Sequence, residues 1–393
     1  MPNWHIVTGE YAPVCGGVAD YTRALAYALA SMGDGVHVWT PTSGNRLATD
    51  PGVQLHPLPD GYGPRGLRAL MNGLHREPAP GRVLVQYVPH AFGMRGVNVP
   101  FCAAIAALRG IEVWVMFHEV ALPWAPPARW KANAAAVLTR AMANILAARA
   151  DRVFVAIPRW ERFLRDVAPL WRGRAIWTPV PSNVPLSVSS SARDEVRALL
   201  RLSPSAPVIG HFGGHGGLIA PLLVRAFRQL LEADPRRVAL FIGSGSEVFV
   251  REVASGTLTG RMIATGELAA SSVAAHLAAC DVLLQPYPDG ISSRRTSTMA
   301  GLALGVPTVT NDGIATEPVW REAGAVALAP SPNELAAAAE ALLALPAEAK
   351  ALGERGRALY ARQFALERTV ETLRRAAGAE PQLRSPLKVA SRA

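Results

Sequence analysis

The chain has 393 residues, of which half are hydrophobic and 18% are charged, so it can form two domains with sizeable cores and is too apolar to be largely disordered. Its formal net charge of +10 favours anionic partners such as nucleotide phosphates, nucleic acid or an anionic membrane surface. The three cysteines lie far apart without metal-ligand spacing, which fits a reducing cytosol.

The sequence shows no segment suited to cross a membrane. No uncharged apolar run reaches the roughly 18 residues that a span needs, and the nearest candidate, residues 101–117, contains Arg109 and Glu112. The first residues lead directly into the strand-like run 4–8, so we expect no secretory signal. We therefore expect a cytoplasmic protein that is at most peripheral at the inner face of the cell membrane.

The first half of the chain alternates strand-like and helix-like segments. Strands are expected at residues 5–8, 36–40, 83–87, 111–117 and 152–156, and helices at 17–32 and 128–150. The second of these helices is rich in alanine and follows a Pro-Pro pair, which suits a helix start. Strands that alternate with helices predict a mostly parallel sheet covered on both faces.

The alternation stops in a stretch rich in serine and proline at residues 181–191 and then begins again. Further strands are expected at 207–212, 238–242, 262–264, 282–285, 308–310 and 325–328, and helices at 218–232, 333–344 and 347–375. We therefore expect two doubly wound α/β domains, at residues 1–185 and 186–375, and a flexible tail at 376–393.

Glycine turns follow three of the predicted strands. Gly16-Gly17 follows the first strand, Gly213–Gly217 opens the second domain in the same way, and Gly243-Ser-Gly245 follows the next strand. Glycine allows a ligand to approach the backbone closely, and ligands of open α/β sheets bind at the carboxyl ends of strands. None of the turns is the G-x-G-x-x-G fingerprint of a nicotinamide-dependent dehydrogenase. Turns at equivalent places in two successive domains predict a shared ligand cleft.

Residues 281–311 read as strand, turn, helix, turn and strand. Asp289-Gly290 is a turn dipeptide, Ser292 or Ser293 can cap the helix, and Gly305 can end it. This pattern places the amino terminus of a helix, with its free backbone N–H groups, at the carboxyl end of a buried strand. Such a position attracts anions.

Charged and titratable side chains lie at predicted strand ends. Arg294 and Arg295 add two positive charges to the helix start, which fits a phosphorylated ligand as well as a surface helix whose arginines face solvent. His118 follows the strand at 111–117. A lone histidine is more often structural than catalytic, so its position keeps both interpretations open.

Together these residues resemble the GT-B-fold glycosyltransferases of family 4. The resemblance covers most of the chain and rests on E-Y-A-P-V-C-G-G-V-A-D-Y at residues 10–21, V-P-S-N at 180–183, the glycine turns, Q-P-Y-P-D-G at 285–290 and A-L-G-V-P-T at 303–308. It implies two Rossmann-like domains that face a central cleft, with acceptor in the first and nucleotide diphosphate in the second. It also implies that the last helix, about 347–375, packs back on the first domain.

The family resemblance implies a retaining, nucleotide-sugar-dependent enzyme that transfers a sugar to a glycan, lipid-linked or small-molecule acceptor, with no metal or other cofactor. The leaving diphosphate would assist the incoming hydroxyl on the same face, so that the protein stabilises the leaving group and positions the reactants. On this resemblance we expect His118 and Asp289 to be catalytic. The residues expected to bind the donor are Gly16, Gly17, Gly214, Gly243, Arg294, Arg295, Ser297 and Glu317.

The segment at 281–311 departs from the family pattern of two glutamates separated by seven residues. Counted forward from the Asp289-Gly290 turn, the two positions hold Asp289 and Ser297. Counted back from Gly305, they hold Ser292 and Ala300. The only strong carboxylates expected to face the sugar hydroxyls are therefore Asp289 and, further along, Glu317.

A second departure concerns the charge that faces the diphosphate. The Arg and Lys of the family pattern fall here at His211 and Gly216. Charge-assisted hydrogen bonds to phosphate are strong, so a missing cation would be costly. Our hypothesis is that Arg294 and Arg295 supply the charge instead.

Alternative functions follow from the altered glutamate pair: a non-catalytic GT-B binding protein, or a GT-B-fold sugar-nucleotide epimerase. A nucleic-acid binder is not expected, because the basic residues are scattered without an aromatic-interleaved patch. In residues 64–76, Leu67, Leu70, Met71 and Leu74 recur at helical spacing. That stripe fits an interfacial helix on an anionic membrane or a surface helix that packs on the sheet.

Overall fold

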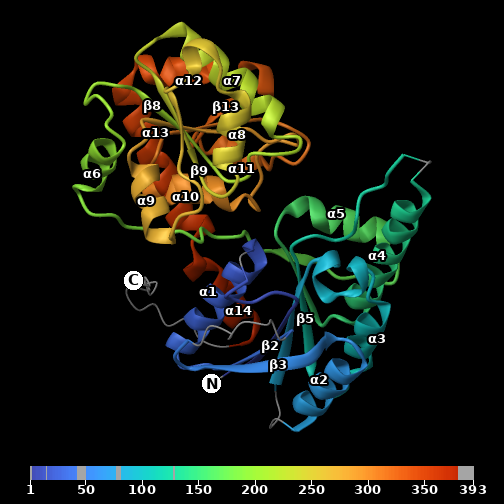
Figure 1. Ribbon diagram of the computed structural model, residues 1–393. Coiled ribbons are helices and arrows are strands. Elements are labelled where there is room, and N and C mark those ends of the chain that lie inside the picture. Colours follow the sequence, from blue (N-terminus) through green and yellow to red (C-terminus); the bar gives the residue numbers. More distant parts are fainter. Residues whose placement is uncertain (1, 15, 42–49, 77–80, 127–128, 379–393) are drawn as a thin grey trace. The chain divides into compact units, whose positions relative to one another are not determined.

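The computed structural model describes residues 2–14, 16–41, 50–76, 81–126 and 129–378 (Figure 1). The chain divides into two compact units. The first comprises the chain up to Val180 together with the segment that begins at Leu366, and the second runs from Pro181 to Ala365. The division therefore falls at the beginning of the Ser- and Pro-rich stretch. The expected tail lies outside the described residues from position 379 onward.

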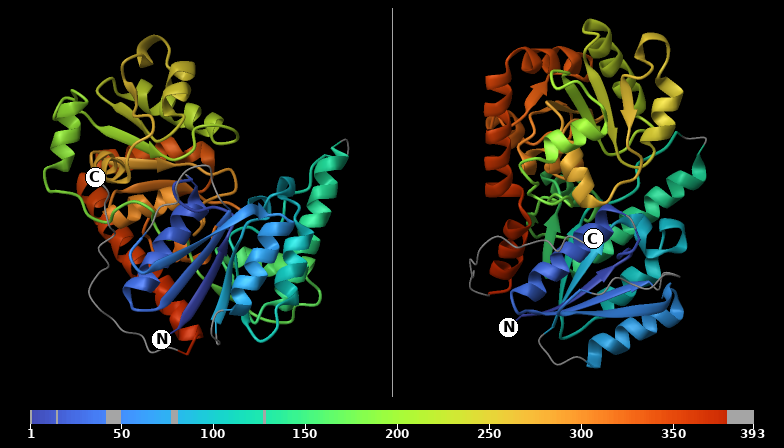
Figure 2. Two further views of the ribbon diagram at one scale, coloured as in Figure 1. Left: turned by 60° about the horizontal axis from the view of Figure 1, so that its bottom comes forward. Right: turned by 60° about the vertical axis from the view of Figure 1, so that its left-hand side comes forward.

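The first unit is built on a parallel sheet that has seven strands within the described residues, in the order β3-β2-β1-β4-β5-β6-β7 (Figures 1 and 2). The strands are β1 (Asn3–Thr8), β2 (Gly35–Pro41), β3 (Val53–Tyr62), β4 (Gly81–Tyr87), β5 (Glu112–Phe117), β6 (Arg152–Val155) and β7 (Ala175–Trp177). The strand order reverses between β1 and β4, which is the place at which doubly wound sheets bind ligands.

Helices cover both faces of this sheet. They are α1 (Gly17–Ser31), α2 (Pro64–Arg76), α3 (Val99–Ala107), α4 (Trp130–Arg149), α5 (Pro158–Val167) and α14 (Leu366–Ala376), with short turns η1 (Pro89–Phe92) and η2 (Met94–Gly96). Successive strand residues point to opposite faces, so Val83 and Val85 join the core under α2, α3 and α4, whereas Leu84 joins the core under α1 and α14. Figure 1 shows these two layers of helices on either side of the sheet.

The second unit repeats the design with a parallel sheet of six strands within the described residues, in the order β10-β9-β8-β11-β12-β13. The strands are β8 (Val208–Phe212), β9 (Val238–Ile242), β10 (Met262–Ala264), β11 (Val282–Gln285), β12 (Thr308–Asn311) and β13 (Ala327–Ala329). The helices are α6 (Ala192–Leu199), α7 (Ala220–Ala233), α8 (Ser246–Val253), α9 (Ala270–Ala278), α10 (Thr296–Leu304), α11 (Pro318–Glu322), α12 (Leu335–Ala344) and α13 (Pro346–Leu359), with η3 (Gly256–Leu258), η4 (Pro332–Glu334) and the π-helical η5 (Tyr360–Phe364). Two Rossmann-like sheets are therefore confirmed.

Two local predictions are wrong, and two strands were missed. The helix predicted at 347–375 is interrupted, because η5 ends at extended Ala365 and α14 begins after it. The helix after the Asp289-Gly290 turn begins at Thr296, and neither Ser292 nor Ser293 caps it, because the Ser293 hydroxyl is bonded elsewhere. The two edge strands β3 and β7 were not expected.

The apolar stripe of α2 faces the interior of the first unit. Leu70 and Leu74 are buried in the core, and Leu67 and Met71 pack against the same cluster. Of the two interpretations of this helix, the structure supports the one in which the stripe packs on the sheet.

Candidate functional site

The glycine turns of the second unit and the start of α10 meet at the carboxyl edge of its sheet. Strands β9, β8 and β11 are neighbours, so the turns that follow them lie side by side. A Cβ atom built on Gly213 would lie 3.3 Å from Cβ of Ser297, and one on Gly243 would lie 3.6 Å from the Gly213 carbonyl oxygen. Gly213 also has a φ of 125°, which favours glycine. Gly243 and Ser297, which were expected to bind the donor, are thus brought together.

Gly214 lies in the open part of the turn, where an added Cβ would meet nothing within 4 Å. Its carbonyl oxygen lies 3.1 Å from Nε2 of His211, whose Nδ1 lies 2.9 Å from the Leu284 carbonyl oxygen. Burial lowers the pKa of His211, so the ring is neutral and can donate to only one of the two carbonyls. His211 therefore contacts the backbone of the glycine turn and does not supply the positive charge that the family pattern has at this position.

The loop between β11 and α10 is anchored by the loop that follows β12. A Cβ on Gly290, whose φ is 85°, would clash with the backbone of Gly313 at 2.4 Å, so only glycine fits there. The Ile291 amide donates to the Asn311 carbonyl oxygen at 3.0 Å, and the Ala315 amide donates to the Asp289 carbonyl oxygen at 2.8 Å. The backbone that presents Asp289 is fixed by these contacts.

Asp289 lies between the two arginines of the same loop. Its Oδ2 accepts from Nη2 of Arg294 at 2.8 Å, and its Oδ1 accepts from Nη2 of Arg295. All three side chains are between 22% and 27% exposed, so the cluster is open to a ligand. Two guanidinium groups and one carboxylate leave one net positive charge. The structure thus places three predicted site residues in one cluster with the sign of charge that an anion needs.

Tyr287 is a site residue that the sequence interpretation missed. The Arg295 guanidinium lies 4.4 Å from the centre of its ring, a distance typical of a cation–π contact. Its hydroxyl is bonded to the hydroxyls of Ser297 at 2.9 Å and Thr298 at 2.8 Å, so it joins the arginine to the first turn of α10. The P-Y-P sequence indicated only a break after the strand.

Glu317 is buried and bonded within the protein. Its carboxylate accepts from the Ser293 amide at 2.9 Å, from the Ser293 hydroxyl at 2.5 Å and from Nε1 of Trp320 at 2.7 Å. Burial raises its pKa, against the lowering effect of these hydrogen bonds. In the structure Glu317 therefore holds the loop that carries the two arginines, whereas its expected contact with the donor remains a prediction.

Replacing Glu317 by Gln is expected to lower the free energy of unfolding by about 1–3 kcal/mol, because an amide NH₂ would face protein N–H or O–H donors in a buried place. Urea unfolding checks the value. Glu340→Gln is the matched control in the same unit, since Glu340 is 43% exposed and pairs with Arg237 near the surface. Equal urea midpoints for the two variants would contradict this role of Glu317.

In the first unit, the start of α1 and the end of β5 form a second cluster. Gly16 precedes α1, and a Cβ there would lie 2.7 Å from Oε2 of Glu10; one on Gly17 would meet nothing within 4 Å. Tyr21, one helical turn later, packs edge-on to His118 with ring centres 4.9 Å apart. The structure thus places the first turns of α1, which begin at the glycine turn, beside His118 through Tyr21.

His118 is buried, and its ring is oriented by the neighbouring strand. Its Nε2 lies 2.7 Å from Oε1 of Gln86, near the end of β4. Burial lowers the pKa of His118 to about 4, so the ring is neutral at pH 7. A ring that donates from Nε2 keeps its lone pair on Nδ1. Gln86 is a second residue that the sequence interpretation missed, although it lies in a predicted strand.

Acid is expected to destabilise the protein in a defined range of pH. Burial lowers the pKa of three histidines, His5, His118 and His215, to about 4, whereas an unfolded histidine titrates near pH 6.5. Between these values the unfolded chain binds protons that the folded chain does not. The free energy of unfolding is therefore highest above about pH 6.5 and falls as the pH drops toward 4, by at most about 3 kcal/mol per histidine.

Urea unfolding at pH 7 and pH 5 measures this loss, and His5→Phe should reduce it. Asp234 contributes only at lower pH, because a hydrogen bond from Arg236 lowers its pKa to about 2. The raised pKa of Glu317 has the opposite sign, because the folded chain then binds a proton more readily than the unfolded chain. A urea midpoint that stays constant between pH 7 and pH 5 would contradict the assignment.

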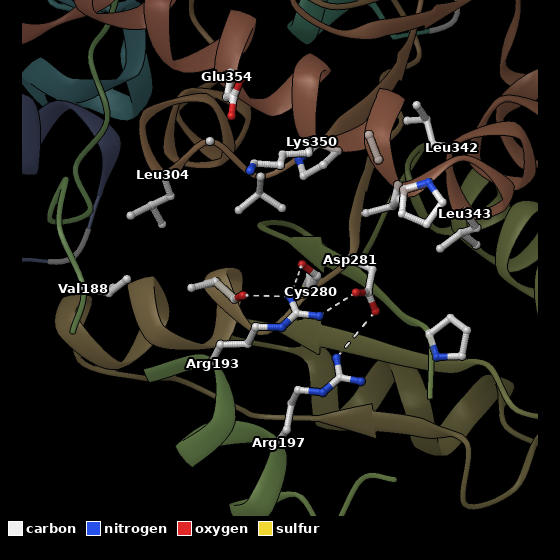
Figure 3. Close-up of a pocket in the computed structure, with 18 of the residues that line it drawn as sticks. Val188, Arg193, Arg197, Cys280, Asp281, Leu304, Leu342, Leu343, Lys350 and Glu354 are labelled. Carbon is white, nitrogen blue, oxygen red and sulfur yellow. Dashed lines mark hydrogen bonds and ion pairs between the residues drawn. The ribbon is translucent and has the colours of Figure 1, made fainter. Parts of the chain in front are cut away.

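A cavity of about 700 Å³ lies at the opposite edge of the second sheet (Figure 3). It is lined by segments that precede β8, β11 and β12 and by parts of α12 and α13. Two arginines that line it are bonded within the protein: Arg193 donates to Asp281 at 2.6 Å, and Arg197 donates to the Ala279 carbonyl oxygen at 3.1 Å. Because ligands of open α/β sheets bind at the carboxyl ends of strands, this cavity is not the expected donor site.

Among the residues that the structure describes, no group of three or more His, Cys, Asp or Glu side chains is arranged to hold a metal ion. No helix in this part of the chain is both long and apolar enough to span a membrane.

Family models match both units. A glycosyl transferase 4-like domain matches residues 16–181, and a domain of the glycosyl transferases group 1 matches residues 207–345. No curated protein matches the chain by sequence.

Solved structures of known glycosyltransferases have the same fold along almost the whole chain. Sucrose-phosphate synthase from Thermosynechococcus elongatus is 18% identical with a TM-score of 0.70, and the match covers 96% of this chain and 98% of that one. Anabaena HepE in complex with UDP-glucose is 15% identical with a TM-score of 0.67, covering 96% and 100%. The α,α-trehalose 6-phosphate synthase from Burkholderia multivorans is 14% identical with a TM-score of 0.66, covering 96% and 99%. The chain therefore belongs to the GT-B-fold glycosyltransferases of family 4, as its motifs predict.

Proposed function

We propose that this glycosyltransferase moves a sugar from a nucleotide-diphosphate sugar to a glycan, lipid-linked or small-molecule acceptor, with retention of the anomeric configuration. The observation that carries the proposal is the meeting of three features at one sheet edge: the glycine turns, the first turn of α10, and the cluster of Asp289, Arg294 and Arg295. The HepE structures with UDP and UDP-glucose support a donor of this class.

The diphosphate is proposed to lie against the start of α10. The first turn of a helix offers backbone N–H groups and the positive end of the helix dipole to an anion. Gly213 and Gly243 leave room for the diphosphate beside this turn, because neither carries a side chain. Arg294 and Arg295 add charge-assisted hydrogen bonds, so that no resident metal ion is required to balance the leaving group.

Donor binding is proposed to exchange the partner of the arginines. In the structure Asp289 accepts a hydrogen bond from both Arg294 and Arg295. A diphosphate that takes over these bonds releases the carboxylate, which can then accept from hydroxyls of the sugar. His118 is proposed to contact the sugar or to stabilise charge that develops as the bond to the diphosphate breaks.

Asp289→Asn separates these two roles. The neutral amide no longer competes for the arginines, so the affinity for free nucleoside diphosphate should rise about 3- to 10-fold, while turnover of the nucleotide sugar falls about 10-fold or more because the carboxylate is missing. Calorimetry and a turnover assay report the two effects separately. Weaker binding of the diphosphate by the variant would contradict the exchange of partners.

The stereochemical claim is tested by the product. Proton NMR of the glycoside formed from an α-linked donor should show an α-linked product, and the rate should be unchanged when EDTA is added. A β-linked product would contradict retention, and loss of activity in EDTA would contradict a site without metal.

A further inference from the structure

Near its amino terminus, helix α4 has a second apolar face that its own unit does not cover. Ala136, Met142 and Leu146 pack into the core of the first unit, as expected for one side of a surface helix. The other side carries Trp130, which is 68% exposed, and Val137, which is 53% exposed. Figures 1 and 2 show the amino-terminal end of α4 standing out from the body of the first unit.

The loop before α4 adds a second indole to this face. Trp124 is 59% exposed, although its surroundings are ordered by α4. The Ala125 amide donates to Oδ1 of Asn133 at 2.8 Å, and the Arg140 guanidinium lies 4.3 Å from the centre of the Trp124 ring. Two indoles, Trp124 and Trp130, are thus exposed along α4 together with Val137. Single exposed hydrophobic residues are common on protein surfaces, whereas several along one helix indicate an interaction surface.

The charged side chains of α4 and of the loop just before it are all positive. Arg129 and Lys131 are exposed on either side of Trp130, and Nζ of Lys131 lies 5.5 Å from the centre of the Trp130 ring. Between residues 120 and 150 the sequence contains Arg129, Lys131, Arg140 and Arg149 and no aspartate or glutamate. Acidic side chains here would repel an anionic membrane surface, so their absence favours such a surface as the partner. A protein that binds an apolar face does not require this absence.

We propose that this surface, formed by Trp124, Arg129, Trp130, Lys131, Val137 and Leu138, docks on an anionic lipid bilayer. Indole rings lie at the level of the lipid headgroups, where their apolar body and N–H group are both accommodated. Val137 and Leu138 then reach the acyl boundary, and Arg129 and Lys131 pair with anionic headgroups. The docking does not depend on which sugar is transferred, and it is distinct from the α2 stripe, which is internal.

The test is cosedimentation with vesicles of phosphatidylcholine alone and of phosphatidylcholine mixed with phosphatidylglycerol. The full-length protein should bind the mixed vesicles, and less at high salt, because salt screens the headgroup charge. Trp124→Ser with Trp130→Ser should weaken this binding roughly tenfold or more, equivalent to about 1.4 kcal/mol per factor of ten. Arg129→Glu with Lys131→Glu should remove the preference for the anionic vesicles.

Leu218→Ser and Arg228→Glu, both exposed in the second unit, are the matched controls and should bind as the wild type does. Turnover of nucleotide sugar in solution should be the same for all of these variants, which shows that they fold. The proposal is overturned if the wild type binds neither kind of vesicle, or if Trp124→Ser with Trp130→Ser binds the mixed vesicles as tightly as the wild type does. It is also overturned if ultracentrifugation shows that the wild type self-associates through Trp130 and does not bind vesicles.

Discussion

Replacing Arg294 and Arg295 together by alanine is expected to weaken binding of the donor's nucleoside diphosphate about 100-fold or more. A hydrogen bond to a charged group contributes about 1.5–3 kcal/mol, and a factor of ten in affinity corresponds to about 1.4 kcal/mol. Both guanidinium groups lie on one loop whose backbone is fixed by the loop after β12. The substitution also leaves Asp289 without its partners, so a negative charge remains where the diphosphate is proposed to bind.

Calorimetric titration of the free diphosphate into wild type and variant measures this loss. Arg321→Ala is the matched control, because Arg321 pairs with Asp312 in the same unit with Nε to Oδ2 at 2.9 Å. Arg294→Lys with Arg295→Lys keeps both positive charges but loses the planar guanidinium groups that bind two phosphate oxygens at once. Its affinity for the diphosphate should therefore lie between those of the double alanine variant and the wild type. An affinity of the double alanine variant equal to that of the wild type would rule out the arginines as the diphosphate's partners.

Replacing His118 by alanine is expected to lower turnover at least about 100-fold while the protein stays folded. Gln86 and Tyr21 hold the ring in one orientation. Because charge develops only as the bond to the diphosphate breaks, a group already oriented toward it stabilises the transition state more than the bound substrate. The measurement is kcat for the preferred nucleotide sugar, with the urea midpoint as the test of folding.

His276→Ala is the control for the loss of a buried histidine, because His276 lies in α9 and its Nδ1 is 2.7 Å from the Ser272 carbonyl oxygen. It should keep normal turnover. Gln86→Leu should lower kcat less than His118→Ala, about 10-fold, because it removes the partner that orients the ring and leaves the ring in place. Near-normal turnover of His118→Ala would show that His118 is structural.

The sheets were largely predictable because local apolar runs and glycine turns mark them. The strands expected from the sequence are all present with ends within two residues of those predicted. The two that were missed, β3 and β7, are edge strands of the first sheet. Strand β3 contains Pro57 and Pro59, which are tolerated at an edge but argue against a strand when read alone.

The detailed site could not be predicted, because long-range contacts decide it. Ser293 looked like a helix cap, but Glu317, 24 residues later, accepts from its amide and hydroxyl. Gln86 and His118 are 32 residues apart and meet only because β4 and β5 are neighbouring strands. The sequence allowed the two arginines to meet an anionic ligand or to face solvent, and it could not show that Asp289 accepts a hydrogen bond from each of them.

The most direct test of the account is turnover of a panel of UDP-, GDP- and ADP-sugars by the wild type, followed as release of nucleoside diphosphate with and without candidate acceptors. We expect at least one donor to be turned over, slowly as hydrolysis and faster with an acceptor, and we expect both His118→Ala and the double arginine variant to lose that activity. Release of diphosphate from none of the donors, or its release at an unchanged rate by both variants, would contradict the proposed site. Conversion of a nucleotide sugar to its epimer without an acceptor would contradict glycosyl transfer as the reaction.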